Sequence, residues 1–133
     1  MKKALRPLSL EYRLKVFPLF NEREHRYKTK FVLETTQSFA SFVYDLSVNE
    51  NIDGNTIHWK VQGLKPPPLS IPASGHARFE REYDALHGTY AFTIESIDGR
   101  SNTFALRFTK NKIQMLKVPR EKFMEVILES SQK

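Results

Sequence analysis

The chain has 133 residues, no cysteine and a formal net charge of +6. This length suits one domain with one hydrophobic core, so we expect a single domain over residues 1–133. The lack of cysteine excludes disulfides, thiolate nucleophiles and thiolate metal ligands, and with them the small disulfide-stapled secreted scaffold.

Alternation of apolar and polar residues predicts strands along most of the chain. Residues 8–16 alternate without a fault, with Leu14 and Val16 on one side and Arg13 and Lys15 on the other. The same period of two predicts further strands at about residues 26–35, 39–48, 57–62, 77–82, 89–97, 104–108 and 113–115. The pattern indicates an all-β protein in which each strand has one buried and one wetted face.

The excess positive charge lies at the N-terminal end. Residues 1–30 carry nine Lys/Arg and three Asp/Glu, whereas the rest of the chain carries twelve of each. A basic patch of Arg13, Lys15, Lys28 and Lys30 would attract nucleic acid by releasing counterions. The nearby aromatic residues, however, are in register with the apolar face and are not interleaved as a base-stacking platform requires. We therefore interpret these cations as solvent-facing strand side chains, and nucleic acid is not the favoured partner.

The first residues begin like the positive end of a signal peptide, but Arg6, Pro7 and Glu11 interrupt any apolar segment. No run reaches the roughly 18 apolar residues that a membrane helix requires. We expect a cytoplasmic protein without an export signal and without membrane association.

The strand at residues 77–82 is more weakly apolar than the others. Arg81 shares a face with Ala77 and Phe79, whereas Arg78, Glu80 and Glu82 take the opposite face. Because this strand is less apolar than the others, we expect it near an edge of the sheet.

A proline-rich crossing separates that strand from the preceding one. Each proline lacks an N–H donor, so this segment is not a central strand, and we interpret it as an extended surface crossing or edge guard. Apolar residues in such a crossing need cover from the protein's own sheet or from a second copy. The predicted partner-binding residues are Leu64, Pro66, Pro67, Pro68, Leu69 and Ile71. A polyproline ligand is less favoured, because Lys65 followed by Pro68 would require proline where Ile71 stands.

The C-terminal segment has helical spacing. Pro119 suits a first helical turn, and Phe123, Val126 and Ile127 would lie on one helix face. We expect one short α-helix over residues 119–129 that plugs one end or side of the sheet.

The segment Gly-Thr-Tyr-Ala-Phe at residues 88–92, preceded by Asp84 and Leu86, resembles the start of strand F in immunoglobulin-like and fibronectin type III sandwiches. The resemblance implies that the Tyr90 hydroxyl bonds back to the backbone near Asp84 and that Trp59 is the core tryptophan. It implies a two-layer antiparallel β-sandwich, to which the C-terminal spacing adds one short α-helix, and it implies no function. An up-and-down β-barrel is the alternative, because the near-continuous hairpin order and the chain length suit it too.

The sequence contains no recognisable catalytic motif. The four histidines, His25, His58, His76 and His87, lie in separate segments without the spacing of a local metal-ligand pair. A metal site assembled from His76, Glu80 and His87 is conceivable in space, but we interpret these as surface residues. Serine nucleophile elbows and glycine-rich phosphate loops are absent as well. We therefore expect no enzyme, no metal and no cofactor.

Three functions remain open. We prefer a non-enzymatic β-sandwich module that acts through protein contacts, with a protein partner or a homodimer formed through an edge strand or the proline crossing. The first alternative is a small β-barrel that binds an apolar ligand. The second is a nucleic-acid-binding protein that uses its basic N-terminal strands.

Overall fold

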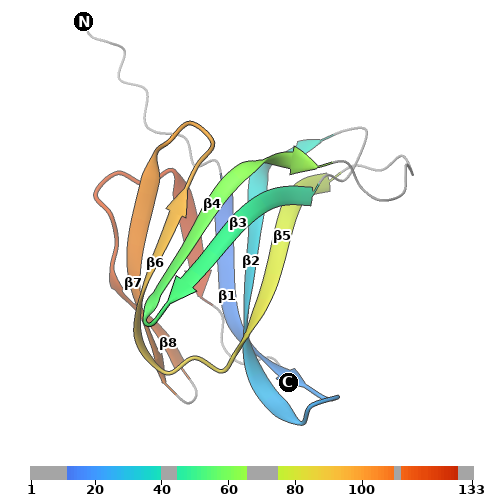
Figure 1. The fold of residues 1–133 in the computed structure, drawn as a ribbon, viewed down its shortest axis with the longest axis vertical. Helices are drawn as coiled ribbons and strands as arrows, with labels where there is room; N and C mark the ends of the chain where they lie inside the picture. Colours follow the sequence, from blue (N-terminus) through green and yellow to red (C-terminus); the bar gives the residue numbers. More distant parts are fainter. Residues whose placement is uncertain (1–11, 40–44, 66–74, 110–111, 129–133) are drawn as a thin grey trace, which may run out of the picture.

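The computed structural model describes residues 12–39, 45–65, 75–109 and 112–128, which form a single sheet of nine strands (Figure 1). The strands are β1 (Tyr12–Asn21), β2 (Arg26–Phe39), β3 (Asp45–Asp53), β4 (Thr56–Lys65), β5 (Gly75–Asp84), β6 (Gly88–Glu95), β7 (Ser101–Thr109), β8 (Lys112–Lys117) and β9 (Met124–Leu128). The prediction of an all-β protein is confirmed. In these ranges no helix is long and apolar enough to cross a membrane.

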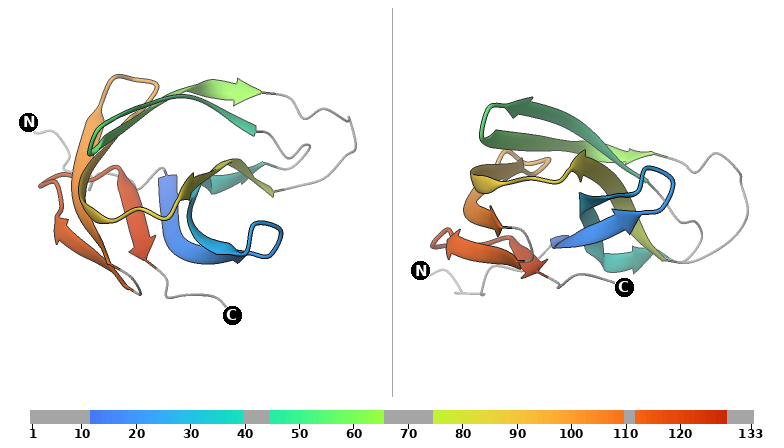
Figure 2. Two further views of the ribbon diagram at one scale, coloured as in Figure 1. Left: turned by 60° about the horizontal axis from the view of Figure 1, so that its bottom comes forward. Right: turned by 90° about the horizontal axis from the view of Figure 1, so that it is seen from below.

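The sheet curls into a nearly closed barrel, with the strand order β8-β7-β6-β4-β3-β5-β2-β1-β9 (Figure 2). Three neighbouring pairs are parallel: β1 with β9, β3 with β5, and β4 with β6. The predicted two-layer sandwich is therefore wrong, because one curled sheet takes the place of two layers. The barrel is not an up-and-down barrel either, since parallel neighbours cannot be joined by a tight turn and need crossing connections.

Aromatic side chains fill the interior of the barrel. The ring of Phe31, on β2, lies 5.8 Å from Trp59, 5.6 Å from Phe92 and 6.4 Å from Phe108, measured between centroids. The largest fully buried side chains are Trp59, Phe31, Phe92, Phe104, Phe108 and Phe123. These rings join strands that do not pair through their backbones, so the core holds the two sides of the barrel together.

The predicted helix over residues 119–129 is wrong where the structure describes it. Met124–Leu128 forms β9 instead, parallel to β1, with Met124 opposite Tyr12. Two causes favour the strand: Val126 and Ile127 are β-branched and lose rotamer freedom in a helix, and the edge of β1 offers backbone partners. The segment also has a period of two, which puts Met124, Val126 and Leu128 against the core.

The buried side chain of Asn102, at the start of β7, positions the residues that lead into β9. It donates a hydrogen bond of 2.9 Å to the Glu121 carbonyl and accepts one of 2.9 Å from the Phe123 N–H. Phe123 then packs edge-on against Tyr12, with ring centroids 6.2 Å apart. Asn102 thus ties the connection between β8 and β9 to the core.

Candidate functional site

Among the hydrogen-bonded neighbours of the sheet, the pairing is weakest between β3 and β5. Among the described residues these strands pair at one position, Asp45 with Arg78, and beyond it they diverge (Figure 1). On its other side each strand is fully paired, β3 with β4 and β5 with β2. Residues 77–82 were predicted to lie near an edge of the sheet. β5 instead lies inside the strand order, but its side that faces β3 is open.

Two clefts follow this line. The smaller has a volume of about 210 Å³ and lies beside the Asp45–Arg78 pair, where its lining includes Leu46, Lys65 and Phe79. The larger, which we call the β3–β5 cleft, has a volume of about 470 Å³ and is lined by Glu50, Asn51, Ile52, Arg81, Glu82 and Tyr83. Because successive strand residues point to opposite faces, this lining comes from both faces of the sheet. The cleft is therefore a gap in the wall.

The turn between β3 and β4 determines which backbone groups of β3 face this cleft. Asp53 pairs with Thr56 across the two residues Gly54 and Asn55, and Gly54 has a φ of 59°. Glycine at the first of two turn positions is typical of a tight hairpin turn, in which the flanking pair exchanges both hydrogen bonds. Since the hydrogen-bonding direction alternates along the strand, the N–H and C=O groups of Glu50 and Ile52 point away from β4 and into the cleft.

Polar side chains bridge the cleft where the backbone ladder is missing. The Trp59 indole Nε1–H, from β4, donates to the Tyr83 hydroxyl at 3.0 Å, and that hydroxyl donates to Glu50 Oε2 at 2.8 Å. The Arg81 guanidinium pairs with the other Glu50 oxygen, Oε1. Burial raises the pKa of Tyr83 above its usual value despite opposing effects of Trp59 and Arg81, so its hydroxyl remains a donor at neutral pH.

Glu50 and Arg81 occupy positions where the strand pattern places apolar residues. Glu50 continues the inward register of Leu46 and Val48, and Arg81 lies between Phe79 and Tyr83 in that of β5. Inward-pointing charges are a common feature of open strand edges. The sequence pattern showed Arg81 in the apolar register but missed Glu50 and Tyr83. Both residues follow from extending the alternation of the two strands, past Val48 to Glu50 and past Phe79 to Tyr83.

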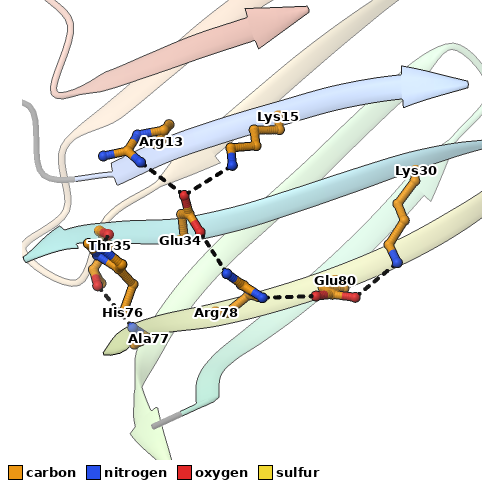
Figure 3. A network of polar contacts seen from close by, with 9 residues as sticks. All are labelled: Arg13, Lys15, Lys30, Glu34, Thr35, His76, Ala77, Arg78 and Glu80. Carbon is orange, nitrogen blue, oxygen red and sulfur yellow. Dashed lines mark hydrogen bonds and ion pairs between the residues drawn. The ribbon is translucent and has the colours of Figure 1, made fainter. Parts of the chain in front are cut away.

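The four cations of the predicted basic patch lie on β1 and β2, and each one pairs with a carboxylate. Figure 3 shows the pairs of Arg13, Lys15 and Lys30. The ion pairs are Arg13–Glu34 at 3.1 Å, Lys15–Glu34 at 3.6 Å, Lys28–Glu24 at 3.4 Å, Lys28–Asp84 at 3.7 Å and Lys30–Glu80 at 3.0 Å. This surface therefore carries interleaved charges of both signs, and its cations are already partly neutralised for any contact with phosphates.

Glu34 is the centre of that network. Its side chain is 3% exposed, and Arg78 adds a third cation at 3.2 Å to the contacts from Arg13 and Lys15 (Figure 3). Burial raises the pKa of Glu34, but Lys15, Arg78 and Arg13 together outweigh it and hold the pKa below its usual value. Because these side chains come from β1, β2 and β5, the network ties three strands together.

Of the predicted partner-binding residues, Leu64 alone falls in the described ranges. It is 44% exposed near the end of β4, opposite Leu46 of β3. Its neighbour Lys65 lines the smaller cleft. The predicted residues Pro66, Pro67, Pro68, Leu69 and Ile71 lie outside the residues that the structure describes. The described part of the predicted partner site thus adjoins the line of the two clefts.

The structure does not bring the candidate metal ligands together. His76 and Glu80 lie four residues apart on β5, which separates their backbones by about 13 Å. His76 Nδ1 lies 2.7 Å from the Thr35 carbonyl, and Glu80 pairs with Lys30 (Figure 3). His87 is exposed in the connection between β5 and β6. No group of three or more metal-ligating side chains occurs among the described residues.

Comparison with known proteins gives no relative: no family model, no curated protein and no solved structure matches this chain. The resemblance of residues 88–92 to strand F of immunoglobulin-like domains therefore stays a prediction. In the barrel, Trp59 lies in the core, and Tyr90, on β6, packs edge-on against Phe108 with ring centroids 5.7 Å apart. Function has to be inferred from the β3–β5 cleft itself.

Proposed function

We propose that this protein is a non-enzymatic binding module that takes up an extended segment of a partner protein in the β3–β5 cleft. The observation that supports this proposal is the single residue pair, Asp45 with Arg78, between two long neighbouring strands. Beyond it, two strand edges face each other across the cleft. In recognition by strand addition, main-chain hydrogen bonds supply the affinity and side-chain pockets supply the specificity.

The uptake of one strand sets a requirement on the width of the gap between β3 and β5. A strand inserted between two neighbours requires about 9.6 Å between them, twice the usual spacing of about 4.8 Å. The connection from Asp84 to Gly88 limits the distance between the end of β5 and the start of β6, because four Cα steps span at most about 14 Å. The start of β6 is in turn held to the β3–β4 turn by a 3.0 Å hydrogen bond from Asn55 Nδ2 to the Thr89 carbonyl. These two ties limit how far the end of β5 lies from the β3–β4 turn, and the separation of about 9.6 Å that one inserted strand requires falls within that limit.

The length of the open edge suits a short segment. On β5 it runs over Phe79–Asp84, or about 20 Å at the usual rise per residue. A segment of about six residues fills it. Each hydrogen bond of such a ladder contributes about 1 kcal/mol net, so we expect an affinity between micromolar and millimolar.

The other candidate functions have less support. An apolar ligand would need room inside the barrel, where the rings around Phe31 are packed against one another. A nucleic acid would need cations that are free to pair with phosphates, and those of the basic patch contact carboxylates. The β3–β5 cleft instead offers backbone groups that an extended chain can use.

Fluorescence anisotropy with a labelled neutral peptide, Thr-Val-Thr-Gln-Thr-Gln-Thr-Val-Thr, tests the proposal. Ile52→Pro removes an N–H that points into the cleft, whereas Ile52→Val keeps it and serves as the matched control. We expect the wild type and Ile52→Val to bind alike and Ile52→Pro to bind at least about tenfold more weakly, provided that circular dichroism shows it folded. Equal binding by all three proteins, or no binding by the wild type at millimolar peptide, contradicts the proposal.

A further inference from the structure

We infer that the segment taken up by the β3–β5 cleft carries a basic residue and, two positions later, an acidic residue. This inference rests on the proposed function and adds the chemistry of the partner. It follows from the register of β3 against β5, from the direction of an inserted strand and from the two charges that face the cleft.

The register comes from the Asp45–Arg78 pair. The irregularity in the pairing of β3 with β4 adds a residue to β4, and that in the pairing of β5 with β2 adds residues to β2. Both β3 and β5 are therefore regular beyond Asp45 and Arg78. Counting equal steps along them places Val48 level with Arg81 and Glu50 level with Tyr83, which agrees with the hydrogen bond from Tyr83 to Glu50.

The direction follows from the neighbours. Because β3 and β5 are parallel, an inserted strand runs either antiparallel to both or parallel to both. The antiparallel arrangement gives the more stable pairing, and it is the one that both strands already have on their other sides. An antiparallel segment passes the level of Glu50 and Tyr83 first and reaches the level of Arg81 two residues later, on the same face.

The charges then determine the order of the side chains. At present Glu50 and Arg81 pair with each other across the cleft, and a strand inserted between them separates them. A partly buried charge such as Glu50 costs free energy when it loses its partner, and the half-exposed Arg81 costs less, so a segment that replaces both partners is favoured. A basic side chain level with Glu50 and a carboxylate level with Arg81 do this. The reverse order sets like charges side by side, which is unfavourable across strands.

Three labelled peptides test the inference by fluorescence anisotropy with the unmodified protein. The first is Thr-Val-Thr-Lys-Thr-Glu-Thr-Val-Thr, and the second, Thr-Val-Thr-Glu-Thr-Lys-Thr-Val-Thr, has the same composition and net charge in the reverse order. The third is the neutral glutamine peptide described above. We expect the Lys-first peptide to bind about tenfold more tightly than the Glu-first peptide.

A double variant, Glu50→Arg with Arg81→Glu, keeps one charge of each sign at the cleft and is expected to prefer the Glu-first peptide. Equal binding of both charged peptides to the wild type, with the neutral peptide still bound, overturns the inference and leaves the proposed function standing. A wild-type preference for the Glu-first peptide, or an unchanged preference in the folded double variant, also overturns it. If none of the three peptides binds, both the inference and the proposed function fail.

Discussion

The indole N–H of Trp59, on β4, donates a hydrogen bond of 3.0 Å to the hydroxyl of Tyr83, on β5. Trp59 is fully buried, and the same hydroxyl donates to Glu50 at the β3–β5 cleft. This chain of hydrogen bonds runs from the centre of the core to the gap in the barrel wall. Because Trp59 is the one tryptophan of the sequence, its fluorescence reports on both.

Tyr83→Phe leaves the Trp59 N–H without its acceptor and removes one of the two groups that hold Glu50. We expect the free energy of unfolding to fall by about 1–2 kcal/mol, the usual cost of a buried donor left unpaired. Urea denaturation followed by Trp59 fluorescence measures the change. Tyr27→Phe is the matched control, because Tyr27 is exposed on β2 and its substitution should cost less than about 0.5 kcal/mol. Equal losses in both variants would contradict this account of Tyr83.

Glu34→Gln removes the charge that Arg13, Lys15 and Arg78 share. We expect a loss of about 2 kcal/mol in the free energy of unfolding at pH 7. Because the folded protein lowers the pKa of Glu34, its contribution is present above the usual carboxyl pKa and is lost as the pH falls through the folded value. Urea denaturation from pH 7 down to pH 3 should therefore show wild type and variant converging in acid. A constant difference would rule this out. Glu125→Gln is the control, because the Glu125 side chain is exposed on β9.

Asn102→Ala leaves the Phe123 N–H and the Glu121 carbonyl without the partner that orders the start of β9. The expected loss is about 2 kcal/mol, because the hydrogen bond at the Phe123 N–H is buried and water cannot easily replace the amide there. Urea denaturation measures it, with Asn49→Ala on the exposed face of β3 as control. A loss of less than about 0.5 kcal/mol in the free energy of unfolding would contradict the role given to Asn102.

Asp98, in the connection between β6 and β7, accepts hydrogen bonds from the Arg100 side chain, from Ser96 and from the Arg100 backbone N–H, which lower its pKa to about 2. Arg100→Ala should raise this pKa towards the ordinary aspartate value of 3.8. An NMR titration of the side-chain carboxyl carbon measures it. Arg107→Ala, at an exposed position of β7, should leave the value unchanged, and an unshifted pKa in Arg100→Ala would exclude the assigned cause.

The strands could be predicted from the sequence because most of them bury one face. In β7, Phe104, Leu106 and Phe108 are buried, while Thr103, Arg107 and Thr109 on the other face are exposed, and this alternation is visible in the sequence itself. β9 shows the limit of such reasoning. Phe123, Val126 and Ile127 also fit helical spacing, and the competing partner of the segment is β1, at the other end of the chain. Local pattern does not reveal a pairing over that separation.

The cleft was harder to predict than the strands. Arg81 was visible as a charge in the apolar register of its strand, and that irregularity marks the site. Its partner Glu50 could not be identified from the sequence. The contact between the two residues depends on β3 and β5 lying side by side in parallel at Asp45 and Arg78. Strand order in a mixed sheet is a tertiary property, and the gap between two strands becomes visible once that order is known.

Amide hydrogen exchange at Glu50 and Ile52, measured by NMR with and without the neutral glutamine peptide, tests the central claim most directly. Among the described residues of the free protein, neither N–H group has a strand partner on the cleft side, so both should exchange quickly. The peptide should slow both by at least about tenfold, while residues 17–21, on the part of β1 beyond β9, should not change. Protection that appears on β1 instead, or unchanged exchange at Glu50 and Ile52 with the peptide bound, would contradict strand uptake in the β3–β5 cleft.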